Sequence, residues 1–167
     1  MSLSVALLVA AASTCTIPAS EEAAQTALPY SEFDGRDGPF GWRALAAAGC
    51  ADSAVALLTR YAEAHRGRLA LAQGREIAFH IGQVLAMVGR EQEAIAPLEQ
   101  ALDAEAPAEW VAYVRATLAF LRRDMTALQE ARASYAALAP GSVRLRIIDG
   151  LVACPKEPYM KAAHCRM

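Results

Sequence analysis

Apolar residues recur at helical spacing over much of the chain and predict a series of amphipathic helices. Ile77, Ile81, Leu85 and Val88 form one such stripe, at the three- and four-residue intervals that place side chains on one face of a helix. The sequence lacks runs with two-residue alternation, which would predict strands. The pattern therefore predicts an all-α fold.

Turn residues divide the helices into pairs. The predicted pairs occupy residues 42–48 with 52–64, 69–88 with 91–104, and 108–122 with 125–138. Asp52 stands where an N-cap is expected for the second helix of the first pair. Pro140 and Gly141 end the third pair, and the apolar face of residues 142–153 predicts a capping helix. Pro158 predicts the first turn of a short helix in the tail.

Small residues stand where the helices of the second pair would touch. Gly82 lies in the first helix, Ala94 lies in the second, and Gly89 lies in the turn between them. Two helices approach closely only where their side chains are small. We therefore expect Gly82 to let Ala94 approach.

Residues 81–102 resemble a tetratricopeptide repeat, which has a period of about 34 residues. The positions that carry the resemblance are Ile81, Gly82, Leu85, Gly89, Ala94, Leu98 and Ala101. At the same period Gly82 aligns with Ala116 of the third pair. The resemblance covers about residues 42–138. It implies antiparallel helical hairpins stacked as a short right-handed solenoid, closed by the C-terminal capping helix.

The resemblance also implies a binding face, because members of the family hold ligands on the concave face made by the first helix of each hairpin. By register, this face would hold Glu76, Phe79, Gln83, Met87, Trp110, Tyr113, Thr117 and Phe120. Aromatic residues and a methionine suit a groove for an extended or helical peptide. The alternative is that Trp110, Tyr113 and Phe120 pack on the capping helix and the linker. Both interpretations stay open on the sequence alone.

Composition narrows the class of partner. The chain has 167 residues, enough for one domain with its own core. Its 16 basic residues are spread among 18 acidic ones, for a net charge of −2. A nucleic-acid-binding protein would carry a basic face, so the charge gives no argument for a nucleic-acid partner. The partner that the resemblance implies is a protein or peptide.

The N-terminus predicts export. Residues 3–12 have the length and apolar character of a signal-peptide core, and this stretch is too short to span a membrane. We assign residues 1–19 to the signal, with small residues at 10–12 and 17–19 as alternative cleavage points. Lipid anchoring at Cys15 is the other alternative, although the residues before it depart from the usual lipoprotein motif.

Residues 20–39 are predicted to be a linker, because they are rich in Pro, Gly and acidic residues and lack an apolar period. The helical-repeat domain is then 40–153, and the tail is 154–167. An alternative role for the acidic segment is a tail that captures a basic partner.

Two cysteines bracket the tail. In an exported chain we expect a disulfide between Cys154 and Cys165, which requires the tail to fold back, because a straight helix would hold the sulfurs too far apart. Pairing of Cys50 with one of them is the alternative. Removal of Cys15 with the signal would leave one cysteine free. With His164 the two tail cysteines lack the spacing and the fourth ligand of a zinc site, so we expect no metal or cofactor.

No nucleophile and base stand at a spacing that predicts catalysis, and His80, in an apolar helix, is expected to be hydrogen-bonded structure. Residues 110–124 also resemble a segment of small exported bacterial proteins, and this resemblance carries no function with it. From the helical-repeat resemblance and the predicted export, we expect a non-enzymatic protein-interaction scaffold of the bacterial envelope, periplasmic or secreted. The alternatives are a secreted inhibitor or immunity-type protein, and a small enzyme that uses Cys154 or Cys165 with His164. The enzyme would need an accessible thiolate of lowered pKa.

Overall fold

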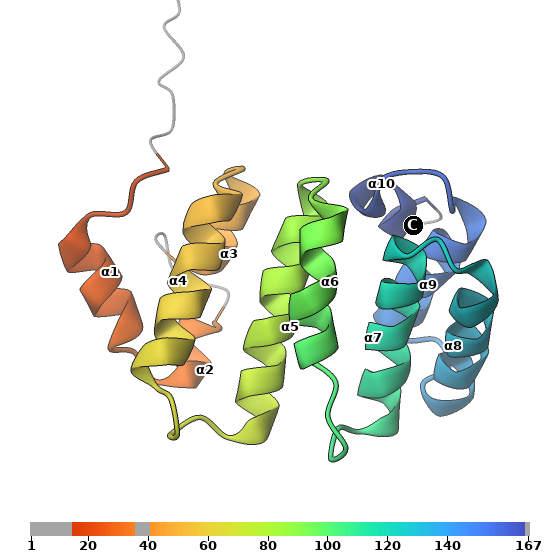
Figure 1. The fold of residues 1–167 in the computed structure, drawn as a ribbon, viewed down its shortest axis with the longest axis horizontal. Coiled ribbons are helices and arrows are strands. Elements are labelled where there is room, and N and C mark those ends of the chain that lie inside the picture. Colours follow the sequence, from red (N-terminus) through yellow and green to blue (C-terminus); the bar gives the residue numbers. More distant parts are fainter. Residues whose placement is uncertain (1–14, 36–40, 166–167) are drawn as a thin grey trace, which may run out of the picture.

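The computed structural model describes residues 15–35 and 41–165. Within these ranges the protein has ten α-helices and no strand, which confirms the predicted all-α class. The helices are α1 (Ala19–Thr26), α2 (Tyr30–Phe33), α3 (Trp42–Ala47), α4 (Ala51–Ala64), α5 (Leu71–Met87), α6 (Glu91–Gln100), α7 (Ala108–Leu121), α8 (Met125–Leu138), α9 (Val143–Ala153) and α10 (Tyr159–Ala163). Figure 1 shows them as a row, with α1 at one end and α8 to α10 at the other.

Consecutive helices pack against each other as pairs: α3 with α4, α5 with α6, and α7 with α8 (Figure 1). The turn within each pair contains one residue of positive φ, which is Gly49 (80°), Gly89 (82°) and Arg123 (59°) respectively. Glycine adopts this conformation without steric cost. Arginine does not, so the third turn needs compensating contacts, which Arg123 makes with the tail.

Gly82 sets the crossing of α5 and α6. A Cβ atom at residue 82 would lie 2.5 Å from the Cγ of Leu98 and 3.0 Å from the carbonyl oxygen of Ala94. Ala94 and Leu98 are themselves fully buried. The expected close approach of α6 to Gly82 is therefore confirmed.

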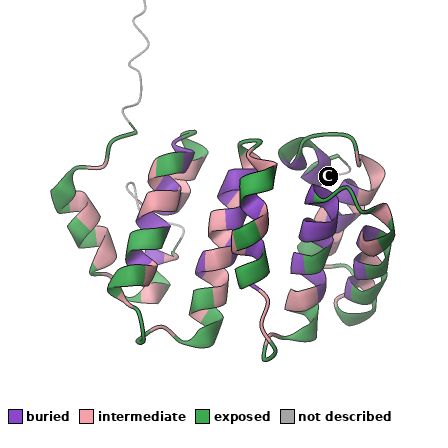
Figure 2. Ribbon diagram, viewed as in Figure 1, coloured by how far each residue is buried: buried purple, intermediate pink, exposed green. Residues whose placement is uncertain are grey.

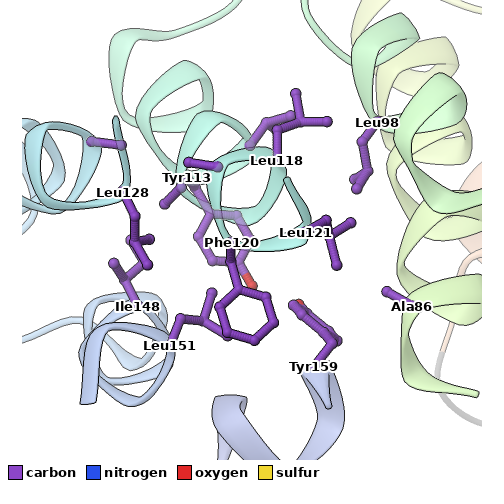
Figure 3. Close-up of a cluster of buried hydrophobic side chains, with 14 of the residues drawn as sticks. Ala86, Leu98, Tyr113, Leu118, Phe120, Leu121, Leu128, Ile148, Leu151 and Tyr159 are labelled. Atoms are coloured by element: carbon purple, nitrogen blue, oxygen red, sulfur yellow. The ribbon is translucent and has the colours of Figure 1, made fainter. Parts of the chain in front are cut away.

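Buried positions occur along the row of helices (Figure 2). The buried side chains form two clusters that meet in the middle of the row. The N-terminal cluster surrounds Tyr61 of α4. The C-terminal cluster extends from α5 to α10 and includes Phe120 of α7 (Figure 3). Val55 and Ile81 pack against both clusters, so the hydrophobic core is continuous from one end of the row to the other.

The segment expected to be a linker is helical instead. Residues 20–35 hold most of α1 and all of α2. The Phe33 ring stacks on Tyr61 with centroids 3.7 Å apart, and the Tyr61 hydroxyl donates a 2.9 Å hydrogen bond to the Leu28 carbonyl. These helices are too short to show an apolar period, and the prolines that predicted a linker, Pro18 and Pro29, stand at their N-cap positions. The boundary expected at 39/40 lies outside the described residues.

Asp52 is not the N-cap of α4. The cap position belongs to Cys50, and the Asp52 carboxylate pairs with Arg90. Side-chain caps occur at two later helices. The Asp124 carboxylate accepts from the Ala127 N–H at 3.0 Å, and the Ser142 hydroxyl accepts from the Leu145 N–H at 3.1 Å.

The described cysteines form two disulfides and none is free. Cys154 pairs with Cys165 as expected, and their Cα atoms are 6.4 Å apart because the tail folds back on α9. Cys15 pairs with Cys50, so the alternative pairing of Cys50 with a tail cysteine is wrong. Cleavage after residue 19, one of the predicted points, would remove Cys15 and with it this pair. The predicted signal core, residues 3–12, lies outside the described residues.

Among the described residues, no helix combines the length and the apolar character needed to cross a membrane.

Candidate functional site

A cleft of about 360 Å³ lies between α3, α5 and α10. We call it the α3–α5–α10 cleft. The side chains that give it its character come from all three helices and are Trp42, Arg43, Gln83, Met87, Tyr159 and Met160. Gln83 and Met87 are two of the residues expected on the binding face. The cleft therefore combines apolar walls with hydrogen-bonding groups that come from helices far apart in the sequence.

Asp34, at the end of α2, joins the N-terminal segment to this face. Its Oδ1 atom lies 2.9 Å from Arg43 Nη2 and 3.3 Å from His80 Nε2. Burial alone would raise the pKa of Asp34, but the hydrogen bonds and charges of His80 and Arg43 hold that pKa below its ordinary value. The expected hydrogen bonding of His80 is thus met at Nε2, whereas its buried Nδ1 has no hydrogen-bond partner among the described residues. The Arg43 guanidinium also lies 4.1 Å above the centre of the Trp42 ring.

Glu76, the first of the expected face residues, is engaged by the N-terminal segment. Its carboxylate accepts a 2.7 Å hydrogen bond from the Tyr30 hydroxyl. Burial, together with this hydrogen bond to Glu76, raises the pKa of Tyr30 far above its ordinary value. The phenol therefore remains a neutral donor, and it ties α2 to α5.

Four of the expected face residues belong to the core. Phe79, Tyr113, Thr117 and Phe120 are at most 4% exposed. The Phe79 ring lies 5.2 Å from the Trp110 ring and 5.5 Å from the Tyr113 ring, and the Trp110 indole donates a 2.8 Å hydrogen bond to the Ala101 carbonyl. These four side chains thus do not line an open groove. Core packing, the alternative drawn from the sequence, describes Tyr113 and Phe120.

The tail helix α10 is one of the segments that cover α7. Its Tyr159 side chain is 2% exposed, and the ring centroid lies 6.1 Å from that of Phe120 in an edge-to-face arrangement (Figure 3). Burial raises the pKa of Tyr159, and the smaller opposing influence of the polar side chains of Gln83, Tyr113 and Thr117 does not cancel it. The Tyr159 hydroxyl therefore stays protonated.

Glu91 and Arg123 hold the tail in this position. One carboxylate oxygen of Glu91 accepts a 2.9 Å hydrogen bond from the Tyr159 N–H, and the other pairs with Arg123 Nη2 at 2.6 Å. Arg123 also donates a 2.8 Å hydrogen bond to the Pro155 carbonyl, and its guanidinium lies 4.7 Å from the centre of the Phe120 ring. These contacts explain an arginine at a position of positive φ.

Sequence reasoning missed the contributions of Trp42, Arg43, Tyr159 and Met160 to the cleft. The spacing of Cys154 and Cys165 showed that the tail folds back, but it did not show which helices the tail meets. The signals that place Tyr159 are the non-local contacts with Glu91 and Phe120, and no local pattern contains them.

A second cleft, of about 590 Å³, lies along α7 and α8. Alanines line much of it, and Arg115, Arg122, Asp124 and Glu130 give it charges of both signs. This mixed lining selects no particular class of partner. Within residues 15–35 and 41–165, no group of three or more His, Cys, Asp or Glu side chains is arranged to hold a metal ion.

No protein-family model, no curated protein and no solved structure matches this chain. A function for the chain therefore rests on the geometry of its structure.

Proposed function

We propose that the chain is a non-enzymatic protein-interaction module of the bacterial cell envelope, periplasmic or secreted, built as a short tetratricopeptide-like right-handed solenoid. The observation that carries this proposal is the α3–α5–α10 cleft, in which Gln83 and Met87, two residues of the implied binding face, meet side chains from α3 and the tail. Concave, mostly apolar sites with a few polar groups are the usual form of binding sites.

The solenoid interpretation is supported by the second helix pair. Gly82 permits the close approach of Ala94 and Leu98, and Gly89 turns the chain at positive φ. These are the small and turn positions on which the resemblance rests. A row of such pairs displays side chains from several helices on one face, which is how helical-repeat proteins bind partners.

The disulfides support the compartment. Both pairs join segments near the ends of the described chain, Cys15 to Cys50 and Cys154 to Cys165. Stable disulfides belong to oxidising compartments such as the periplasm or the extracellular space. This chemistry and the apolar stretch at residues 3–12 support an envelope or secreted location.

The lining of the cleft favours a peptide with an apolar anchor side chain. Met87 and Met160 provide flexible, polarizable walls that adapt to the shape of a partner. Arg43 and Gln83 provide donors for the carbonyl groups of a bound main chain. An apolar anchor with polar contacts around it is the usual arrangement of interaction sites.

The alternatives drawn from the sequence find less support. In the acidic segment, Glu22 pairs with Arg60 and Asp34 pairs with Arg43, so these acids already have partners within the chain. A Cys/His enzyme would need a thiolate. The sulfurs of Cys154 and Cys165 are joined, and His164 Nδ1 lies 2.8 Å from the Met160 carbonyl oxygen.

Selection of peptides from a displayed library on the oxidised protein tests the proposal. Met87→Glu places a charge in the cleft, and Val88→Glu places the same charge one residue away, on an exposed position. Selected peptides should carry a large apolar residue and should lose at least tenfold in affinity on Met87→Glu but not on Val88→Glu. Equal binding to both variants, each shown to be folded by circular dichroism, would place the interaction elsewhere.

A further inference from the structure

Three side chains with soft donor atoms line the α3–α5–α10 cleft. They are Met87 of α5, and Met160 and His164 of the tail. Figure 1 shows α10 near the end of α5 at which Met87 lies, and the two helices are in contact. Met160 and His164 are exposed and Met87 is part-buried, so this part of the cleft is open to solvent.

Met160 and His164 lie on the same face of the tail helix. Met160 belongs to the first turn of α10, and His164 is its C-cap residue, four positions later. Side chains four residues apart lie one above the other along a helix. The tail therefore supplies two donors to the cleft, and α5 supplies the third. Methionine has three rotatable bonds, so the two thioethers can adjust their positions within a cleft of about 360 Å³.

The His164 ring is held in the tautomer that a metal ligand needs. Its Nδ1 atom lies 2.8 Å from the Met160 carbonyl oxygen. A carbonyl oxygen only accepts hydrogen bonds, so Nδ1 carries the proton, and Nε2 of the neutral ring keeps its lone pair. Metal-binding histidines usually donate their other ring N–H in this way, because the bond fixes the ring and makes the free nitrogen more basic.

The donor atoms select the class of ion. Two thioethers and a neutral imidazole carry no charge, and thioether sulfur is a soft ligand that favours Cu(I). Zinc, calcium and magnesium sites are built from cysteine, histidine and oxygen ligands, and the described residues hold no cluster of three or more His, Cys, Asp or Glu side chains. The described cysteines are joined in disulfides, so methionine provides the soft sulfur of this cleft.

The charges around the cleft permit a monovalent cation. Arg43 is the cationic side chain of the lining that lies nearest in sequence to the N-terminal segment. Its Nη2 atom lies 2.9 Å from Asp34 Oδ1, and the carboxylate offsets the guanidinium charge. A single positive charge on the ion therefore meets little net repulsion.

We propose that Met87, Met160 and His164 form a Cu(I) site, in which the two thioether sulfurs and His164 Nε2 are the ligands. The inference goes beyond the proposed function and does not depend on a peptide partner. A bound ion would join α10 to α5, in addition to the packing of the tail and the Cys154–Cys165 disulfide.

Competition between the oxidised full chain and a chromophoric Cu(I) chelator tests the site. The ion is kept reduced by ascorbate without oxygen, and thiols are left out because they would open the disulfides and release thiolates that bind Cu(I) themselves. Wild type should bind one Cu(I). Met87→Leu, Met160→Leu and His164→Ala should each weaken binding at least tenfold, since losing even the hydrogen-bond partner of a ligand costs about 10- to 100-fold.

Met125→Leu is the matched control, because Met125 lies in α8 and does not line the cleft. Leucine conserves the volume of methionine and removes only the sulfur, and circular dichroism checks that each variant is folded. Met87→Leu is the decisive variant, since copper bound by the tail alone would not respond to a residue of α5. The inference is overturned if wild type binds no Cu(I), if Met87→Leu binds as tightly as wild type, or if Met125→Leu weakens binding equally.

The methyl signals of ¹³C-labelled methionine give a second readout. Cu(I) should shift the signals of Met87 and Met160 and leave that of Met125 in place, and an equal concentration of Zn²⁺ should not reproduce these shifts. Unchanged signals, a shift of all three, or the same shifts with Zn²⁺ would each overturn the inference. No peptide is present in these measurements, so their outcome is independent of the library selection that tests the proposed function.

Discussion

The main-chain N–H of Tyr159 donates a hydrogen bond of 2.9 Å to the Glu91 carboxylate, across 68 positions of sequence. The same carboxylate pairs with Arg123 in the turn between α7 and α8. The Glu91 side chain of α6 therefore connects the tail to the turn that contains Arg123. The position of Tyr159 depends on both Glu91 and Arg123.

Replacement of Glu91 by alanine should loosen the tail. It leaves the Arg123 guanidinium and the Tyr159 N–H without their acceptor, which costs about 1–3 kcal/mol for a part-buried group. Denaturant unfolding should show that loss, and hydrogen exchange should be faster at Tyr159. Glu93→Ala removes an exposed pair with Arg90 on the same helix and should leave the melting temperature unchanged. Equal effects of the two substitutions would contradict this role of Glu91.

Substitution by alanine should destabilise the protein at Gly82 and stabilise it at Gly74. At residue 82 the new methyl group would meet Leu98 and the main chain of Ala94, and such overpacking costs about 1–3 kcal/mol. A Cβ atom added at residue 74 would meet no atom of a neighbouring segment within 4 Å. The substitution should therefore stabilise α5 by about 1 kcal/mol through helix propensity. Thermal unfolding of the two variants measures both signs, and a stable Gly82→Ala protein would exclude the close crossing.

Phe120 should behave as a core residue. It is 1% exposed, and truncation to alanine should cost about 3–5 kcal/mol, the range for buried aromatic residues. Leu138, which is 50% exposed, offers a control at which alanine should change stability by less than about 0.5 kcal/mol. Denaturation curves measure both changes in the free energy of unfolding. A small decrease for Phe120→Ala would show that this face of α7 is open.

Acid should weaken the attachment of α2 to the rest of the protein. The folded-state pKa of Asp34 is lowered, so the unfolded chain takes up the proton first as the pH falls. The stabilisation is present above the unfolded pKa, about 4, and is lost as the pH falls through the lower folded-state value. Asp34→Asn should therefore be less stable than wild type at pH 6, and the difference should shrink toward pH 3. A constant difference in urea titrations would contradict the assignment.

Thiol titration should find no free cysteine in the denatured, unreduced protein and four after reduction. Chain-entropy arguments give about 4 kcal/mol for the Cys15–Cys50 disulfide and about 3 kcal/mol for Cys154–Cys165, because the first closes the longer loop. Denaturation of each Cys→Ser double variant ranks them. A free thiol in the oxidised protein would show that one pair does not form.

The long helices were predictable because their apolar stripes run for several turns. Ile77 to Val88 is enough to define α5, and Gly82 indicated which face α6 would meet. Helices α1 and α2 were missed because eight and four residues do not establish a period. Their stability comes from tertiary contacts such as Phe33 on Tyr61, which no local pattern contains.

Part of the candidate site could likewise be predicted from the sequence, and part could not. Register along α5 placed Gln83 and Met87 on the face that forms the cleft. Register along α7 also placed Tyr113 and Phe120 on the inner face, but it could not show that α10 covers that face. The covering segment is fixed by Glu91 and Gly150, two residues whose partners lie in the tail.

The two disulfides close the two ends of the row of helices. In such a row, each internal pair has neighbours on both sides, whereas a terminal pair has only one and opens first. Proteases cut chains that open locally. Because Cys15–Cys50 and Cys154–Cys165 act where opening would begin, we expect proteolysis to depend on the rarer openings in the middle of the row.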